Sequence, residues 1–181
     1  MIEMLVKGLA VDQESRQPVV ILTDREEKHF LPIWIGFSEA DAILLALEKI
    51  AVPRPGTHDL LKSIIDQMPL KLERVIVTRM EEKVFYAMLV FTDGGEKPPV
   101  EVDCRPSDAV ALALRAGVPV FVSEAVMAEA AILDKGKYEK EMSEFRKFLD
   151  KVKPSDFTEY DDVHKPWQPP EEPGEEGEKS P

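Results

Sequence analysis

The stretch Val100–Gly117, VEVDCRPSDAVALALRAG, decides the fold expected for this chain. Its first six residues alternate between apolar and charged side chains, a pattern typical of a β-strand with one buried face. Pro106 and Ser107 then break the alternation, and the Ala- and Leu-rich run that follows is typical of a helix that ends at Gly117. The stretch therefore predicts a strand that leads directly into a helix. Four polar side chains gather at the junction: Asp103, Arg105, Ser107 and Asp108.

This junction is a candidate functional site, because charged side chains crowded where a strand ends and a helix begins often form binding sites. A plainer interpretation is also open. Ser107 and Asp108 are residue types that cap helices, and Arg105 could simply pair with a carboxylate. The spacing alone does not choose between the two.

A similar pattern occurs earlier, in Pro32–Leu47, PIWIGFSEADAILLAL. Aligning Asp41 with Asp108 places similar small and apolar residues opposite one another along both helices. The sequence thus suggests a weak internal duplication of a strand–turn–helix unit, with an Asp in the first helical turn of each copy. The alternative is that Ala- and Leu-rich helices resemble each other by composition.

Length and charge limit the class of protein. With 181 residues, 44% of them hydrophobic, the chain can bury one core, and one domain with an appendage is expected. The net charge is −12; residues 154–181 hold nine acids and two lysines, a net −7, which leaves −5 for residues 1–153. The absence of a basic run disfavours a strong, salt-dependent grip on a nucleic acid backbone, although a local basic patch is still possible.

Cysteine content and hydropathy exclude further classes. The single Cys104 excludes a disulfide framework and a cysteine-based zinc site. The N-terminal sequence shows no signal peptide, and no apolar run approaches the roughly 18 residues of a membrane span. We therefore expect a cytoplasmic protein without a membrane partner.

The remaining periodicity predicts an α+β fold, with a compact mixed sheet, repeated strand–turn–helix units and flanking helices. Strands are expected at 2–12, 18–23, 29–35, 74–79, 84–92, 100–105 and 118–122. Further helices are expected from Ser38 to about Ala51, from Asp59 to Met68 and from Glu124 to Leu133, with Ser38 and Thr57 as N-caps of the first two. We place a globular domain at 1–134, an amphipathic helix at 135–153, and an acidic, disordered Pro/Glu-rich tail at 154–181.

The loop Val52–Asp59, VPRPGTHD, carries two side chains without an evident structural role, Arg54 and His58. Of the three histidines, His58 is the best candidate for a general base, because imidazole titrates near neutral pH. Asp59 in the first turn of the next helix suits the helix dipole.

Three segments together resemble the bifunctional nuclease domain family of bacteria and plants: LPIWIGFSEAD (31–41), PRPGTHDLL (53–61) and VEVDCRPSDAVALAL (100–114), with VPVFVSEAV (118–126) following. The resemblance covers residues 1–134, and Gly56 is a small departure because a larger residue is frequent there in the family. It implies a compact α+β fold and a nuclease that acts on both DNA and RNA with little sequence preference.

The residue types in these motifs suggest roles, since phosphodiester cleavage needs an activated nucleophile and positive charge near the phosphate. The expected catalytic residues are His58, Asp59, Asp103 and Asp108. The expected substrate-binding residues are Arg54, Arg105 and Ser107. A divalent metal such as Mg²⁺ could be held by Asp103, Asp108, Glu39 and Asp41. A version without metal would use His58 and the arginines alone.

Two other functional classes are open from the sequence. The motif charges could be an ion network that fixes the fold of a non-catalytic regulatory or binding domain. They could also bind a small phosphate-bearing molecule. A homodimer is plausible through the Lys137–Val152 helix or the exposed hairpin strands.

Overall fold

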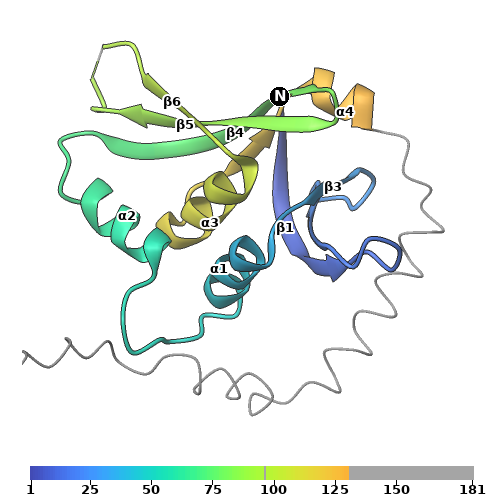
Figure 1. Ribbon diagram of the computed structural model, residues 1–181. Helices are drawn as coiled ribbons and strands as arrows, with labels where there is room; N and C mark the ends of the chain where they lie inside the picture. Colours follow the sequence, from blue (N-terminus) through green and yellow to red (C-terminus); the bar gives the residue numbers. More distant parts are fainter. Residues whose placement is uncertain (96, 131–181) are drawn as a thin grey trace, which may run out of the picture. The chain divides into compact units, whose positions relative to one another are not determined.

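The computed structural model describes residues 1–95 and 97–130 (Figure 1). The seven strands are β1 (Ile2–Val11), β2 (Pro18–Thr23), β3 (Phe30–Trp34), β4 (Lys71–Glu81), β5 (Val84–Thr92), β6 (Val100–Cys104) and β7 (Val120–Val122). The four helices in the described part are α1 (Phe37–Leu47), α2 (Thr57–Ile65), α3 (Pro106–Ala116) and α4 (Glu124–Ala130). The predicted α+β class is confirmed.

The strands form one mixed sheet in the order β3-β2-β1-β7-β4-β5-β6. β7 is parallel to β4 and antiparallel to β1, and the other neighbours are antiparallel. The start of β1 pairs with β7 and the rest pairs with β2. The register shifts at Gly8, whose φ of 156° suits a residue without Cβ.

The sheet consists of two similar halves. Strands β1, β2 and β3 form an antiparallel meander that leads into α1, and β4, β5 and β6 form another that leads into α3. This arrangement agrees with the predicted duplication, but the predicted alignment is two residues off. Counted from the helix starts, Glu39 and not Asp41 takes the position of Asp108, the third residue of each helix.

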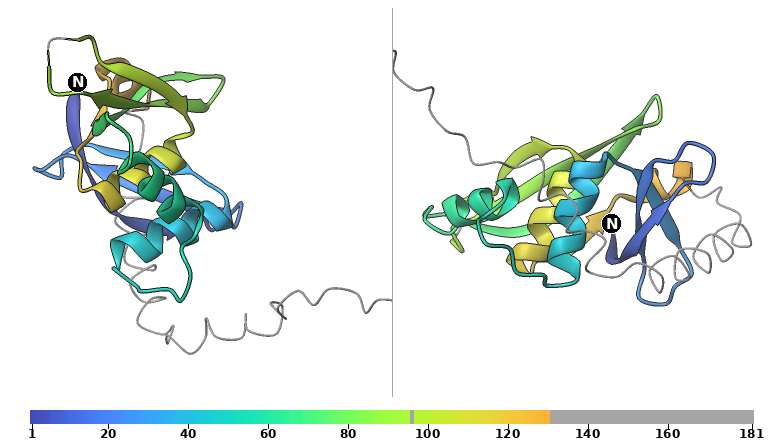
Figure 2. Two further views of the ribbon diagram at one scale, coloured as in Figure 1. Left: turned by 90° about the vertical axis from the view of Figure 1, so that its left-hand side faces the viewer. Right: turned by 60° about the horizontal axis from the view of Figure 1, so that its bottom comes forward.

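Helix α3 lies between α1 and α2, and all three lie on the same side of β4 and β5 (Figures 1 and 2). Residues 109–113 of α3 are buried in succession, because the sheet covers one face of this helix and its two neighbours cover the flanks. The strand-to-helix junction before α3 is thereby fixed at the centre of the helical layer.

Helices α1, α2 and α3 begin one or two residues earlier than predicted, whereas α4 begins at Glu124 as predicted. Gly36, Gly56 and Arg105 are the N-caps, so Ser38, Thr57 and Ser107 lie inside the first turns. A proline forces the residue before it into an extended conformation, so Pro106 makes Arg105 the cap. Glycine is itself a favourable N-cap, so no serine or threonine cap is needed at the other two.

Two helix ends also differ from prediction. Helix α1 ends at Leu47 and α2 at Ile65, before the predicted Ala51 and Met68. Lys49 follows α1 in the left-handed region, with φ of 53°, and a residue in that conformation ends the helical hydrogen-bond pattern.

The segments predicted at 135–153 and 154–181, and the end of the predicted helix at 124–133, lie outside the described residues. In the described part, no helix combines the length and apolar character needed to cross a bilayer. The homodimer stays a prediction.

Candidate functional site

The N-terminus of α2 and the junction between β6 and α3 meet in the structure. His58 Nε2 lies 3.0 Å from Asp108 Oδ1, although 50 residues separate them. Both side chains border a groove of about 580 Å³ between α1, α2 and α3. We call it the His58 groove.

Asp108 is the third residue of α3 and accepts hydrogen bonds on both of its oxygens. Arg105 donates from Nε to Oδ2 at 2.8 Å and from Nη2 to Oδ1 at 3.0 Å. Burial by itself raises the pKa of the Asp108 carboxyl, but the hydrogen bonds from Arg105 and His58 outweigh it and hold this pKa below its ordinary value. Asp108 is therefore an anion at neutral pH.

His58 is buried, with 9% of its surface exposed, and its orientation follows from its partner. An ionised carboxylate can only accept hydrogen bonds, so the proton between the two residues lies on His58 Nε2. The neutral ring then carries its lone pair on Nδ1, which makes no hydrogen bond within the described residues. The pair has the arrangement of a general base held in one tautomer by a carboxylate.

Arg105 provides positive charge at the mouth of the groove. Its side chain is 65% exposed, and Nη1 donates to Glu39 Oε1 at 2.7 Å in addition to the two bonds to Asp108. A guanidinium has five N–H donors. Three are used within the described residues, so the others can donate to a bound phosphate.

Asp59, predicted to be catalytic, belongs to a second ion pair. Arg115 Nε donates to Asp59 Oδ1 at 2.6 Å, and the Gly56 N–H donates to Oδ2 at 2.8 Å. These hydrogen bonds, from Arg115 first, hold the pKa of the Asp59 carboxyl below its ordinary value. With both oxygens occupied, Asp59 is placed to hold the start of α2 in position.

Arg115 is the one residue of the site that the sequence did not indicate. Its Nη1 also donates to the carbonyls of Ala42 and Ala111, so one guanidinium joins α1, α2 and α3. A cation in the last turn of a helix has an ordinary explanation in the helix dipole. The sequence alone therefore gave no reason to expect that Arg115 bonds to residues far away in the chain.

The other predicted site residues do not all lie in the His58 groove. Arg54 and Asp41 line the His58 groove, and Arg54 makes no ion pair within the described part of the chain. Partial burial raises the pKa of the Asp41 carboxyl. Ser107 borders a different cavity, described below.

Asp103 does not border the groove. It pairs with Met88 in the sheet, while the next residue, Cys104, packs against the core. Successive strand residues face opposite sides, so Asp103 points away from the core. Burial, and then the nearby Asp108 and Asp103, raise the pKa of the Cys104 thiol to about 12, so this thiol is protonated at neutral pH.

The four carboxylates predicted to hold a metal are not gathered into one group. Among residues 1–95 and 97–130, no three His, Cys, Asp or Glu side chains form a group that could hold a metal ion. Both Asp108 oxygens and one Glu39 oxygen already accept hydrogen bonds. This donor set does not fit Mg²⁺ as arranged, and the metal role stays a prediction that a chelator experiment can test.

Comparison with known proteins gives a family. Residues 20–135 match the family model of the bifunctional nuclease domain. The chain is 41% identical over 164 residues to the uncharacterized protein Rv1829 of Mycobacterium tuberculosis, covering 86% of this chain and 97% of that protein.

Two plant proteins are more distant relatives. The chain is 29% identical over 114 residues to bifunctional nuclease 2 of Arabidopsis thaliana, and 27% identical over 116 residues to bifunctional nuclease 1 of Oryza sativa subsp. japonica. The alignments cover 61% and 64% of this chain but only 35% of each plant protein. The similarity to named nucleases is therefore confined to one part of those proteins.

Proposed function

This chain belongs to the bifunctional nuclease domain family, and we propose that it hydrolyses phosphodiester bonds of DNA and RNA with little sequence preference, using the His58 groove as its active site. The observation that carries the proposal is the contact between His58 and Asp108 beside Arg105. It combines a base, a carboxylate that orients the base, and a cation with free donors.

In the proposed reaction, His58 Nδ1 takes a proton from a water molecule whose oxygen attacks the phosphorus. Asp108 stabilises the imidazolium that forms, and the bond from phosphorus to the leaving sugar oxygen breaks as that oxygen takes a proton from solvent. Water as nucleophile makes the ribose 2′-hydroxyl unnecessary, which suits a nuclease for both DNA and RNA.

The arginines supply the electrostatic part. Negative charge grows on the phosphate oxygens as water attacks, and donors already in place stabilise it. Arg105 is held by Glu39 and Asp108, so its free N–H groups are oriented before substrate binds. Arg54, exposed on the opposite loop of the groove, would bind the same or the neighbouring phosphate.

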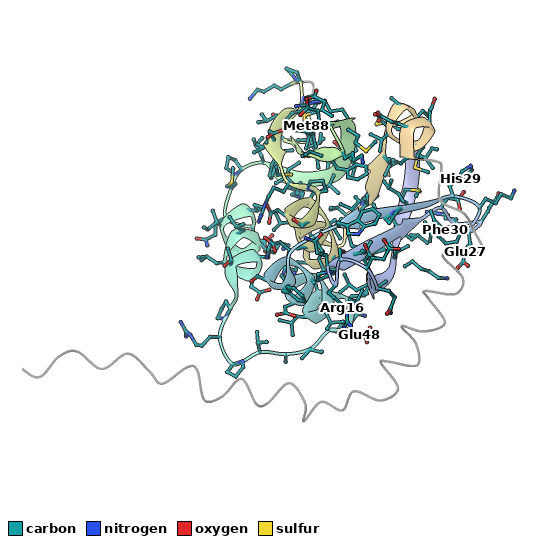
Figure 3. The ribbon with its side chains drawn as sticks, turned by 45° about the vertical axis from the view of Figure 1, so that its right-hand side comes forward. Arg16, Glu27, His29, Phe30, Glu48 and Met88 are labelled. Carbon is teal, nitrogen blue, oxygen red and sulfur yellow. The ribbon has the colours of Figure 1, made fainter. Side chains whose placement is uncertain are left out.

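The test replaces His58 with Gln and measures cleavage of labelled single-stranded DNA and RNA. We expect a loss of about 100-fold or more in kcat/KM, the usual contribution of a general base. The matched control is His29→Gln. His29 also pairs with an aspartate, Nδ1 to Asp24 Oδ2 at 2.7 Å, but lies on the far side from α2 (Figure 3).

Equal cleavage by wild type and His58→Gln, after identical purification, would indicate a contaminating nuclease and contradict the proposal. A chelator arm addresses the metal. Activity is expected to persist after chelation, because the proposed step uses side chains alone. Loss that Mg²⁺ restores would instead support the carboxylates as ligands.

A second candidate function, a non-catalytic regulatory or binding domain, is favoured by one specific observation. Each of the acids at the third position of α1, α2 and α3 accepts a hydrogen bond from an arginine on the α3 segment, so the charges also hold the helices together. It predicts that His58→Gln and Asp108→Asn lower the melting temperature, while the wild type cleaves neither DNA nor RNA.

A further inference from the structure

A second cavity, of about 410 Å³, lies on the other side of Arg105 from the His58 groove. It is bordered by the N-termini of α1 and α3 and by the turn between β4 and β5. We call it the Trp34 cavity, and its chemistry is carried by Trp34, Lys83, Phe85, Arg105 and Ser107. We infer that it binds an unpaired nucleotide next to the phosphate cleaved in the His58 groove, with the base stacked on Trp34 and the flanking phosphate held by Lys83 and Arg105. The inference rests on the proposed nuclease function.

Trp34 is 47% exposed, although large aromatic side chains are usually buried. Its ring nitrogen donates to Asp12 Oδ2 at 3.0 Å, which holds the ring by its polar edge. An indole fixed at one edge loses little freedom when a flat ligand covers it. Aromatic side chains of this kind are the platforms on which proteins stack unpaired bases.

Lys83 supplies a cation without a counterion. It makes no ion pair within the described residues, in contrast to Arg105. It also has φ of 67°, and the preceding Glu82 has φ of 49°, so two side chains occupy turn positions at which Asn and Gly are preferred. This turn presents Lys83 at the edge of the cavity.

Arg105 and Glu39 border both cavities, so the two adjoin at one guanidinium. A strand that places one phosphate at His58 would pass over Arg105 and bring its next nucleotide to Trp34. Lys83 and Arg105 outnumber the single carboxylate among the residues that border the cavity, Glu39. Glu39 and Asp108 pair with Arg105, so among the described residues that border the cavity Lys83 is the cation without an ion pair.

Ser107 adds a polar group to the wall. It is 6% exposed, borders the cavity, and its hydroxyl makes no hydrogen bond within the described part of the chain. This hydroxyl can bond to a phosphate or sugar oxygen. The sequence-based expectation that Ser107 contacts substrate therefore applies to this cavity.

The inference predicts a preference for single strands, since a base in a duplex is already stacked and paired. The test uses the full chain with two substitutions. Trp167→Phe leaves Trp34 as the one tryptophan, and His58→Gln prevents cleavage of the oligonucleotides during the measurement. The probes are a deoxyadenosine hexamer, an abasic hexamer with the same phosphates, and a duplex. We expect the hexamer to quench Trp34 fluorescence and the other two to leave it nearly unchanged.

Affinity is measured by anisotropy of labelled oligonucleotides. Trp34→Ala is expected to weaken binding of the hexamer by about 10-fold and binding of the abasic strand hardly at all, because stacking of one base is lost. Trp34→Phe should restore part of the affinity and shows that the site folds. Lys83→Gln should weaken both ligands several-fold, whereas Lys71→Gln, at the other end of the β4–β5 hairpin, should not.

Absence of quenching, or equal affinity of Trp34→Ala and wild type for the hexamer, would overturn the inference. The nuclease proposal would survive that result if wild type cleaves and His58→Gln does not. If the hexamer quenches Trp34 fluorescence but the wild type cleaves no substrate, the nuclease proposal is contradicted and the nucleotide-binding cavity is supported.

Discussion

Asp108 serves two partners of different kinds. It orients His58 and it neutralises Arg105, and each contact depends on its negative charge. Because its pKa is lowered in the folded protein, ionisation of Asp108 is coupled to folding. Because the pKa of Asp108 is lower in the folded than in the unfolded protein, its ionisation stabilises the fold at pH values above the unfolded pKa of about 3.8. This stabilisation is lost as the pH falls through the folded pKa.

We therefore expect Asp108→Asn to lower the free energy of unfolding by about 1 kcal/mol at pH 7, less than is usual for bonds to a charged group because the site is partly open to solvent. The difference from wild type should shrink as the pH falls below 4. Urea unfolding at pH 7 and pH 3 measures both values. Asp66→Asn, which removes an exposed pair with Lys62, is the control and should cost less at pH 7. A difference that does not change with pH would contradict the assignment.

The three site helices share one feature at their starts. Each has an acid as its third residue: Glu39 in α1, Asp59 in α2 and Asp108 in α3. A carboxylate in the first turn suits the positive end of the helix dipole. The same position brings each acid to an arginine, so a local preference of helices also builds the site.

Two glycine N-caps provide a matched pair of substitutions. A Cβ on Gly36 would clash with the Glu39 carboxylate, which is bonded to Arg105, whereas a Cβ on Gly56 would lie 3.4 Å from Asp59 Oδ2, an ordinary contact. We expect Gly36→Ala to lower kcat/KM several-fold and Gly56→Ala to leave it nearly unchanged. Both lose a glycine cap, so their stability costs should be similar, a few tenths of a kcal/mol to about 1 kcal/mol.

Kinetics and thermal unfolding of the two variants separate these effects. If both lowered cleavage equally, the orientation of Arg105 by Glu39 would not matter for activity.

At the scale of the whole molecule, two arginines of the α3 segment have different tasks. Arg115 is 11% exposed and joins three helices, whereas Arg105 is 65% exposed and faces both cavities. Arg115→Met should lower the free energy of unfolding by about 2 kcal/mol, because it removes the hydrogen bonds by which this buried guanidinium joins Asp59, Ala42 and Ala111. Arg105→Met should cost about 1 kcal/mol or less but abolish most cleavage.

Denaturant unfolding and cleavage per folded molecule, measured for both variants, test this division. The expected result is a stable, inactive Arg105→Met and a destabilised Arg115→Met that retains cleavage. Loss of folding in both would favour the ion network of a non-catalytic domain.

The sequence by itself determined most of the elements. The apolar run in α3 gave a buried helix and the alternation in β6 gave a strand, because both are local patterns. The buried face expected for β6 was wrong: Val100 and Val102 are 47% and 44% exposed, since β6 is the edge strand of the sheet. The family motifs likewise indicated that His58 and Asp108 belong to one site. The helix starts were misplaced by one or two residues, because several cap residues compete at each start and Pro106 decided one of them.

Only the tertiary structure decided which charges meet. The order of the strands, with β7 between β1 and β4, brings the two meanders and their helices together, and no local pattern encodes that order. It paired Arg105 with Glu39 across 66 residues and Arg115 with Asp59 across 56, and it left Asp103 outside the groove. The sequence states which side chains are charged, but which of them form ion pairs depends on the tertiary fold of the whole chain.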